Sequence, residues 1–317
     1  MSQVWLPFWP KNAAISASLI DLIDIGEFCL VLLILCFVFA MMLVFCLKYR
    51  RGSQAPRHIP SVKSWHWEIG WTSATLAAFL VLFVIGAKAY LFLYKSPPHY
   101  QLELYVVGKQ WMWKVQHPGG QREIDAVHVP INRVVKVILA SQDVIHSFYV
   151  PAFRLKHDVV PGQFETFWFK ADRVGSYPLE CSEFCGVEHA HMIGSVTVMS
   201  DAGYSRWLTD QGVTESLAQQ GFALFRRYGC SGCHDPASTV HAPSLDGLFG
   251  SMVHLADGRS TVADERYIRD CILIPETQRV AGYPPVMPSF QGQLSEEDLV
   301  RILAYIKSLS AGAGKSP

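Results

Sequence analysis

The sequence predicts a membrane protein in three parts: two membrane-spanning helices, a β-sandwich and a helical C-terminal domain. Residues 28–47 carry no charge, short β-branched runs follow residue 100, and apolar residues recur at helical spacing near the C-terminus. Half of the 317 residues are hydrophobic and only 17% are charged, which is a low charged fraction for a soluble protein. The formal net charge is zero, so we expect no nucleic-acid partner.

The N-terminal part, residues 1–95, is expected to contain two spans, at about 26–47 and 69–94. At about 1.5 Å per residue, a charge-free helix of this length crosses a hydrocarbon core of roughly 30 Å. The second run carries a single charge, Lys88, near enough to its end for the long side chain to reach the interface. A cleaved signal peptide is the alternative for the first run, but its basic residues follow the apolar core and no small-x-small cleavage site is evident.

The charges around the spans predict the orientation of the chain. Between the spans, five cations stand against one acid, Glu68, whereas the segment before the first span has one lysine and three acids. The positive-inside rule therefore places this loop in the cytoplasm and both termini outside. The two spans would contact membrane lipid. The five cations are Lys48, Arg50, Arg51, Arg57 and Lys63.

Residues 96–200 are predicted to form the β-sandwich. Short β-branched and aromatic runs bounded by Gly, Pro and Asp are typical of an antiparallel sandwich. Residues 201–214 are predicted to be a linker, because aspartates and glycines interrupt the pattern there. The runs are 102–107, 134–139, 165–170 and 194–199.

The segment from Cys181 to Met192 brings two thiols, an imidazole and a thioether together within twelve residues. Soft sulfur with imidazole is a copper ligand set, and the second cysteine, Cys185, lets both sulfurs bridge two metals. His189 supplies one nitrogen, and His146, in an apolar run before a proline, supplies the other. We interpret the set as a two-copper electron-transfer centre.

Two other interpretations of the paired cysteines have to be weighed: a disulfide in an oxidising compartment, and a zinc site. The offsets of Glu183, His189 and Met192 disfavour both, because zinc has little use for a thioether. His191 is interpreted as a residue at the rim of the site.

The sequence Cys230-Ser-Gly-Cys233-His234 is the CxxCH pattern, in which two thiols form thioethers with haem and the histidine ligates the iron. Met287 stands in a proline-rich loop, a suitable place for the sixth ligand. Apolar residues at helical spacing flank the motif. Residues 215–317 are therefore predicted to be a helical domain with one covalent haem; for CxxCH alone, a zinc or dithiol motif is the alternative.

These motifs, together with Gly108-Lys-Gln-Trp111-Met-Trp113, resemble subunit II of the haem–copper cytochrome c oxidases over roughly residues 20–200. Residues 215–311 resemble a class I cytochrome c. The resemblance implies a cupredoxin-like sandwich with a binuclear copper centre, called CuA, and an all-α cytochrome c domain that carries haem c.

The resemblance also implies a role for each ligand. One copper would take His146, the two cysteines and Met192, while the other would take His189, the same cysteines and the backbone carbonyl of Glu183. The Glu183 side chain would help to bind magnesium at the contact with subunit I. Trp111 would be an electron-entry point, and Glu68 would lie near the mouth of a proton path.

As a member of this family, the chain would be the electron-entry subunit of a proton-translocating oxidoreductase. Electrons would pass from haem c to CuA and on to the haems of subunit I, which reduces oxygen to water. The implied partners are subunit I, subunit III, and an upstream respiratory complex or donor cytochrome. Covalent haem is attached outside the bacterial cytoplasm, so we expect a bacterial inner-membrane protein whose copper and haem domains are periplasmic.

Two further functions remain open. A CuA-type nitric oxide reductase uses the same electron-entry module with a different catalytic subunit. A copper-delivery or thiol-redox assembly protein would share the cysteine pair and a distant histidine, but it would need neither Met192 nor a haem domain.

Overall fold

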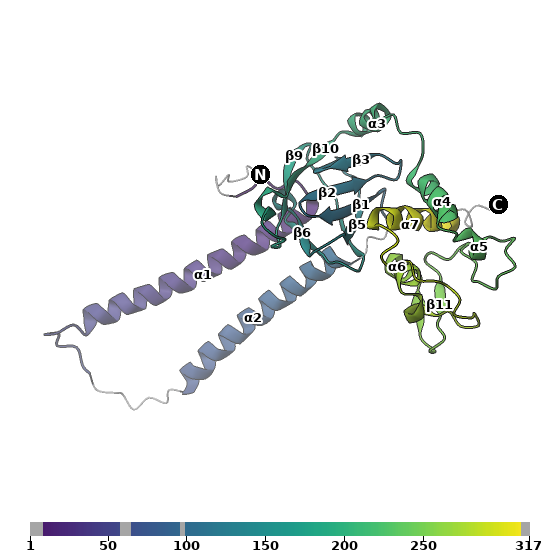
Figure 1. The fold of residues 1–317 in the computed structure, drawn as a ribbon. Coiled ribbons are helices and arrows are strands. Elements are labelled where there is room, and N and C mark those ends of the chain that lie inside the picture. Colours follow the sequence, from purple (N-terminus) through teal and green to yellow (C-terminus); the bar gives the residue numbers. More distant parts are fainter. Residues whose placement is uncertain (1–8, 58–64, 96–98, 312–317) are drawn as a thin grey trace. The chain divides into compact units, whose positions relative to one another are not determined.

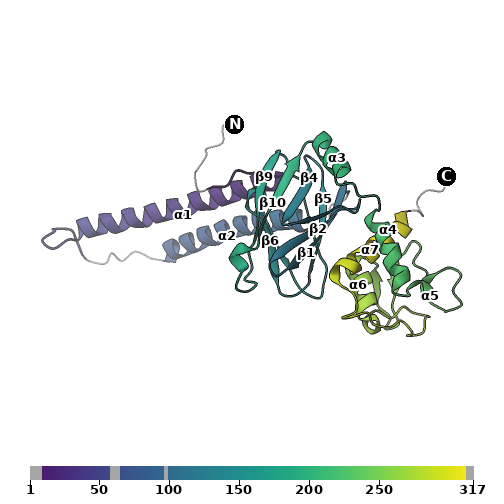
Figure 2. The same ribbon diagram turned by 45° about the horizontal axis from the view of Figure 1, so that its top comes forward.

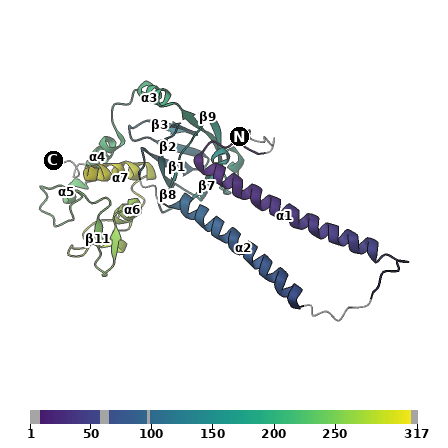
Figure 3. The same cartoon turned by 180° about the vertical axis from the view of Figure 1, so that it is seen from behind.

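A computed structural model describes residues 9–57, 65–95 and 99–311. The chain divides into two compact units, residues 16–95 and residues 1–15 with 96–317. The first unit consists mainly of two long helices, α1 (Ile15–Lys48) and α2 (Trp65–Tyr94), which run in opposite directions (Figure 1 and Figure 3).

Helices α1 and α2 are both long and apolar enough to cross a membrane, and almost none of the most apolar stretch of either helix is buried. Both helices include the expected spans. α1 begins earlier than predicted, at Ile15, because the segment with Asp21, Asp24 and Glu27 that precedes the charge-free run is also helical. Glu68 lies in the first turn of α2. Lys63 lies outside the described residues, and the orientation of the termini stays a prediction.

The second unit contains a sandwich of two five-stranded sheets (Figure 2). The first sheet has the order β3-β2-β1-β5-β8 and the second has the order β4-β10-β9-β6-β7. Side chains alternate between the two faces of each strand. In β1, Leu104 and Val106 therefore join the core of the sandwich, whereas Tyr105 and Val107 face outward. The strands are β1 (Leu102–Lys109), β2 (Met112–Gln116), β3 (Arg122–Ile124), β4 (Ala126–Pro130), β5 (Val135–Ser141), β6 (His146–Val150), β7 (Leu155–Val159), β8 (Glu165–Phe169), β9 (Gly175–Cys181) and β10 (Ile193–Met199).

The purely antiparallel pattern expected from the sequence is wrong for two strand pairs. β1 pairs with β5 in parallel, and β10 pairs with β4 in parallel. In both pairs several strands intervene along the chain, so the partner returns by a long connection and can enter the sheet in the same direction. The alternation of apolar and polar residues along a strand shows which side chains face the core. It does not show whether the neighbouring strand runs parallel or antiparallel.

The predicted linker contains a helix, α3 (Asp201–Asp210). The Ser200 side chain caps it by accepting a hydrogen bond from the Gly203 backbone. Tyr204 and Trp207 hold the helix against the sandwich, because the Tyr204 hydroxyl lies 3.1 Å from His117 Nδ1 and the Trp207 ring stacks on His128. These contacts join residues that are far apart in the sequence. The local sequence of residues 201–214, with its aspartates and glycines, therefore could not reveal the helix.

The C-terminal domain is built mainly from helices around one cavity. A capping box of Ser216 and Gln219 starts α4. The core of this domain is continuous with the outward-facing side chains of β1 and β5, so the domain packs on that face of the sandwich. The elements are α4 (Leu217–Arg227), α5 (Ser231–His234), β11 (Met252–His254), β12 (Ser260–Val262), α6 (Glu265–Leu273) and α7 (Glu296–Ala311).

Candidate metal and haem sites

The sulfur and imidazole side chains predicted as copper ligands converge at one end of the sandwich. His146 begins β6, Cys181 ends β9, and Met192 directly precedes β10. The two cysteine sulfurs lie 3.7 Å apart. Cys181 Sγ lies 3.9 Å from His146 Nδ1, and Cys185 Sγ lies 3.4 Å from His189 Nδ1 and 3.8 Å from Met192 Sδ. The donor atoms are thus within reach of one small shared site.

Burial separates these donors from solvent. His146, Cys181, Cys185 and Met192 are all buried, and His189 is half-buried. Among the described residues, His146 and the two cysteines form the group of buried potential metal ligands whose donor atoms lie within 4.8 Å of one another. Buried sulfur and imidazole donors that converge at such distances are typical of a site for a soft metal.

A carboxylate orients the His146 ring. His146 Nε2 lies 2.8 Å from Asp143 Oδ1 and donates its proton to it, which turns Nδ1 toward Cys181. Asp143 is itself held by the backbone N–H groups of Gln110 and Val144, each at 2.7 Å. Such a carboxylate–histidine contact is the usual support of a metal-ligating imidazole, because it sets the tautomer and the ring angle.

The two thiols differ in acidity. Burial alone would raise the pKa of Cys181, but hydrogen bonds, first of all the one with His146, lower it to about 6. Burial and the adjacent Cys181 sulfur raise the pKa of Cys185. One thiolate therefore forms readily beside a second sulfur, and thiolate is the form that binds a soft metal.

The first tryptophan of the Trp-Met-Trp sequence also contacts the site. Trp111 Nε1 donates to the Cys185 carbonyl at 3.2 Å, and the Gln110 side chain donates to the same oxygen at 2.8 Å. Gln110 was not predicted, although its position beside Trp111 could have suggested it. Gly108 packs closely against the same site, since a Cβ atom at this position would lie 3.0 Å from Cδ2 of His146.

Glu183 and His191 lie at the edge of the site. The Glu183 carbonyl oxygen is 3.3 Å from Cys181 Sγ, while the Glu183 side chain is exposed. His191 is exposed and pairs with Glu188 instead of pointing to the sulfurs. The Glu183 carbonyl thus lies beside a cysteine sulfur, and the roles expected for Glu183 and His191 stay predictions.

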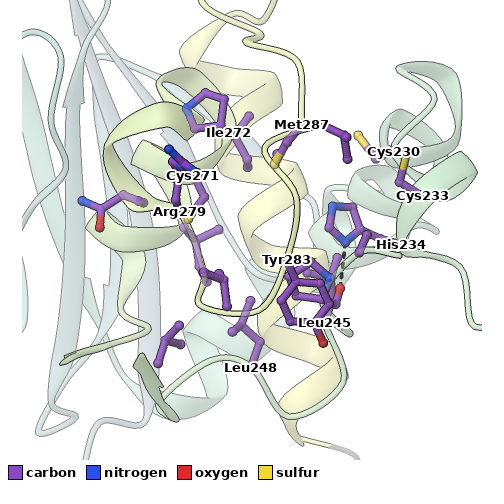
Figure 4. A pocket seen from close by; sticks show the side chains of 18 of the residues that line it. Cys230, Cys233, His234, Leu245, Leu248, Cys271, Ile272, Arg279, Tyr283 and Met287 are labelled. Carbon is purple, nitrogen blue, oxygen red and sulfur yellow. Dashed lines mark hydrogen bonds between the residues drawn. The ribbon is translucent and has the colours of Figure 1, made fainter. Parts of the chain in front are cut away.

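The C-terminal domain encloses a cavity of about 570 Å³ whose walls come from α6, α7 and the loops around α5. In Figure 4, Cys230, Cys233 and His234 lie on one side of this cavity, and the loop of Met287 faces them. His234 Nδ1 donates to the Pro243 carbonyl at 2.9 Å. This hydrogen bond leaves Nε2 of His234 available for a ligand in the cavity.

The donor sets fit the groups that the sequence suggested. Two adjacent sulfurs with imidazole and thioether suit copper better than zinc or a hard cation. A large apolar cavity with two thiols at its edge, an oriented imidazole and a facing thioether suits a covalently attached haem. Arg279, Tyr283 and Cys271 also line this cavity, and none of them was predicted from the sequence.

Comparisons with known proteins agree with both domains. The family described as "Cytochrome C oxidase subunit II, periplasmic domain" matches residues 118–199, and the family "Cytochrome c" matches residues 218–310. Cytochrome c oxidase subunit 2 of Alkalihalophilus pseudofirmus is 29% identical, over 86% of this chain and 82% of the relative.

Two further similar proteins come from other bacteria. Alternative cytochrome c oxidase subunit 2 of Bradyrhizobium diazoefficiens is 28% identical over 58% of this chain and 76% of the relative. A crystal structure of the periplasmic domain of subunit II of cytochrome oxidase from Bradyrhizobium japonicum is 32% identical, covers 36% of this chain and 96% of its own, and has a TM-score of 0.35. Residues 118–199 therefore match the periplasmic domain of the cytochrome c oxidase subunit II family, and residues 218–310 match the cytochrome c family at the C-terminal end of the chain.

Proposed function

We propose that this chain is the electron-entry subunit of a haem–copper oxidase that reduces oxygen to water with proton translocation. Electrons would pass from its covalent haem c to a binuclear copper centre and on to the haems of subunit I. The observation that carries this proposal is the convergence of two cysteine sulfurs, 3.7 Å apart, with two imidazoles and a thioether. A single copper would need only one of these sulfurs.

The chain would hold the two coppers with ligands from two loops. His146, both cysteines and Met192 would serve one copper, and His189, the same cysteines and the Glu183 carbonyl would serve the other. Copper bridged by two thiolates can take up and release one electron at a time. The residues around it limit movement, because Asp143 orients His146 and the sandwich core surrounds Met192. A rigid ligand set needs little rearrangement when its charge changes.

The chain would hold the haem through thioethers to Cys230 and Cys233, with His234 and Met287 as axial ligands. Haem held between histidine and methionine exchanges single electrons at a raised potential. The Pro243 carbonyl keeps the proton of His234 on Nδ1, away from the cavity. The largely apolar walls of the cavity would further favour the reduced, less charged iron.

Three site roles belong to the same proposal. Trp111 would be a point of electron entry, supported by its hydrogen bond to the Cys185 carbonyl. The exposed Glu183 side chain would help to bind magnesium where subunit I contacts this domain. Glu68, in the first turn of α2, would lie near the mouth of a proton path.

The proposal also places the chain in its surroundings. Both termini and the two large domains would lie on the periplasmic side of a bacterial inner membrane, as the cationic loop before α2 indicates. Subunit I and subunit III would pack beside the two apolar helices. A respiratory complex or a donor cytochrome would reduce the haem c.

Metal and haem analysis of the purified full chain tests the proposal. We expect two coppers and one covalent haem per chain. An electron shared by two copper nuclei should give a seven-line paramagnetic resonance pattern. A four-line pattern from one copper, zinc in place of copper, or a disulfide between Cys181 and Cys185 would contradict it.

A further inference from the structure

The contact between the two domains contains four buried charges. Glu103 of β1 and Lys136 of β5 are cross-strand neighbours on the outer face of the sandwich. Glu265 of α6 and Lys307 of α7 come from the cytochrome c domain. The four side chains retain only 9–14% of their exposure.

Each ammonium group contacts both carboxylates. Lys307 Nζ lies 2.6 Å from Glu103 Oε2 and 2.8 Å from Glu265 Oε1. Lys136 Nζ pairs with Glu265 and lies 3.8 Å from Glu103 Oε2. The two positive and two negative charges thus close a ring of net charge zero, and two of its four contacts cross from one domain to the other.

The surroundings of the ring are largely aromatic and apolar. The Tyr105 hydroxyl donates to Glu103 Oε1, and Lys307 lies 4.5 Å from the centre of the Phe249 ring. Burial alone would raise the pKa of Glu265, but Lys307 and Lys136 hold it below its ordinary value. The carboxylate is therefore ionised because its partners from both domains are in place.

Buried charges favour one arrangement over its alternatives. Sliding or rotating the cytochrome c domain would leave a carboxylate or an ammonium buried without its partner, which costs far more than an exposed pair contributes. An apolar contact alone tolerates such shifts. The face of β1 and β5 is apolar around the ring, with Val107, Ile138 and Ala140 in the shared core. Other directional contacts cross between the domains farther out, such as Lys114 with Glu297 and Arg269 with the Gly162 carbonyl. On this face, the four charges are the contact that can specify the register.

We propose that Glu103, Lys136, Glu265 and Lys307 form an interdomain clamp that locks the cytochrome c domain in one orientation on the copper domain. The two domains then behave as one rigid body and not as a tethered pair that docks and separates. The clamp rests on these contacts alone. Its consequence for electron delivery, that haem-to-copper transfer has no docking step, rests on the proposed function.

Exchanging the charges tests the clamp in the full chain. The variant E103K/K136E reverses the copper-domain half, and E265K/K307E reverses the cytochrome half. Each half exchange places like charges opposite each other in both crossing contacts, while the combined four-fold exchange restores every pair. All of these variants keep the net charge of the chain unchanged.

A second ion pair between the two domains, outside the clamp, can be used to measure whether the domains are docked. Lys114 of β2 and Glu297 of α7 lie 2.6 Å apart, with 23% and 26% side-chain exposure. A zero-length carbodiimide should couple these two residues only while the domains are docked, and mass spectrometry quantifies the product. The crosslink yield depends on neither copper nor haem. If the proposed function were wrong, the yield would still report whether the two domains are docked.

We expect each half exchange to lower the yield of this crosslink about tenfold or more, and the four-fold exchange to return it to within about twofold of the parent. The control exchange D257R/R259D, at an exposed pair within the cytochrome c domain, should leave the yield unchanged. The proposal would be overturned if either half exchange gave the same crosslink yield as the parent chain, or if the four-fold exchange did not restore that yield.

A salt series on the parent chain covers the case in which a half exchange fails to fold, as circular dichroism would reveal. Charges as buried as these are weakly screened. The crosslink yield should therefore stay within about twofold between 0.05 M and 1 M salt. A steep loss at high salt would mean that exposed charges hold the domains together, and the clamp would be rejected.

Discussion

The copper site and the haem site hold their groups by different physical means. At the copper site, short contacts position the ligands: Asp143 orients His146, and Cys185 Sγ lies within 4 Å of both Cys181 Sγ and Met192 Sδ. At the haem site, a large apolar cavity provides most of the surface that would contact the haem, and a hydrogen bond to the Pro243 carbonyl orients His234. A metal ion needs donor atoms that point at it, whereas a large cofactor such as haem is positioned mainly by the side chains packed around it.

The largest effect should follow from removing one bridging sulfur. In the variant C181S we expect copper to fall from two per chain to almost none, because a hydroxyl is a hard, weakly basic donor for copper. The covalent haem should remain, since its cavity shares no ligand with the copper site. Elemental analysis beside the haem absorption spectrum measures both.

The control for this variant is C271S, which replaces a thiol that lines the haem cavity and has no proposed ligand role. It should keep both coppers. Two coppers retained in C181S would show that Cys181 does not bridge the metals.

A smaller effect is expected at the haem. In M287A the haem should stay attached through its thioethers, but its reduction potential should fall by on the order of 0.1 V, because a thioether opposite histidine favours the reduced iron. Potentiometric titration measures the shift. Met252 lines the same cavity but is 59% exposed, so M252A should leave the potential almost unchanged. An equal shift in both variants would argue that Met287 acts by packing and not as a ligand.

The smallest effect is expected when the residue that orients the His146 ring is changed and all copper ligands are kept. In D143N the copper ligands are all present, but His146 loses its charged partner, so copper affinity should fall by about 10- to 100-fold. Competition with a chelator measures the affinity, and the hyperfine splitting of the copper resonance should change with the angle of the imidazole. D158N, at an exposed carboxylate on β7, is the matched control. If the copper affinity and the hyperfine splitting were unchanged in D143N, Asp143 would not orient the His146 ligand.

Much of the fold and of both sites was predictable from short segments. The two apolar helices follow from uninterrupted hydrophobic runs, and the helical domain follows from apolar spacing around CxxCH. The sequence did not reveal the parallel direction of two strand pairs or the helix within the predicted linker. Both depend on partners far along the chain, such as the contacts of Tyr204 and Trp207 with the sandwich.

The sequence by itself determined which donors this protein offers, because the identity and close spacing of cysteines, histidines and methionines carry the ligand chemistry. It could not determine which distant groups meet. Only the tertiary structure brought Gln110 to the Cys185 carbonyl, 75 positions away, and Glu103 to Lys307, 204 positions away. Such pairings depend on how sheets and helices pack, and a buried charge is satisfied by whatever lies beside it in space.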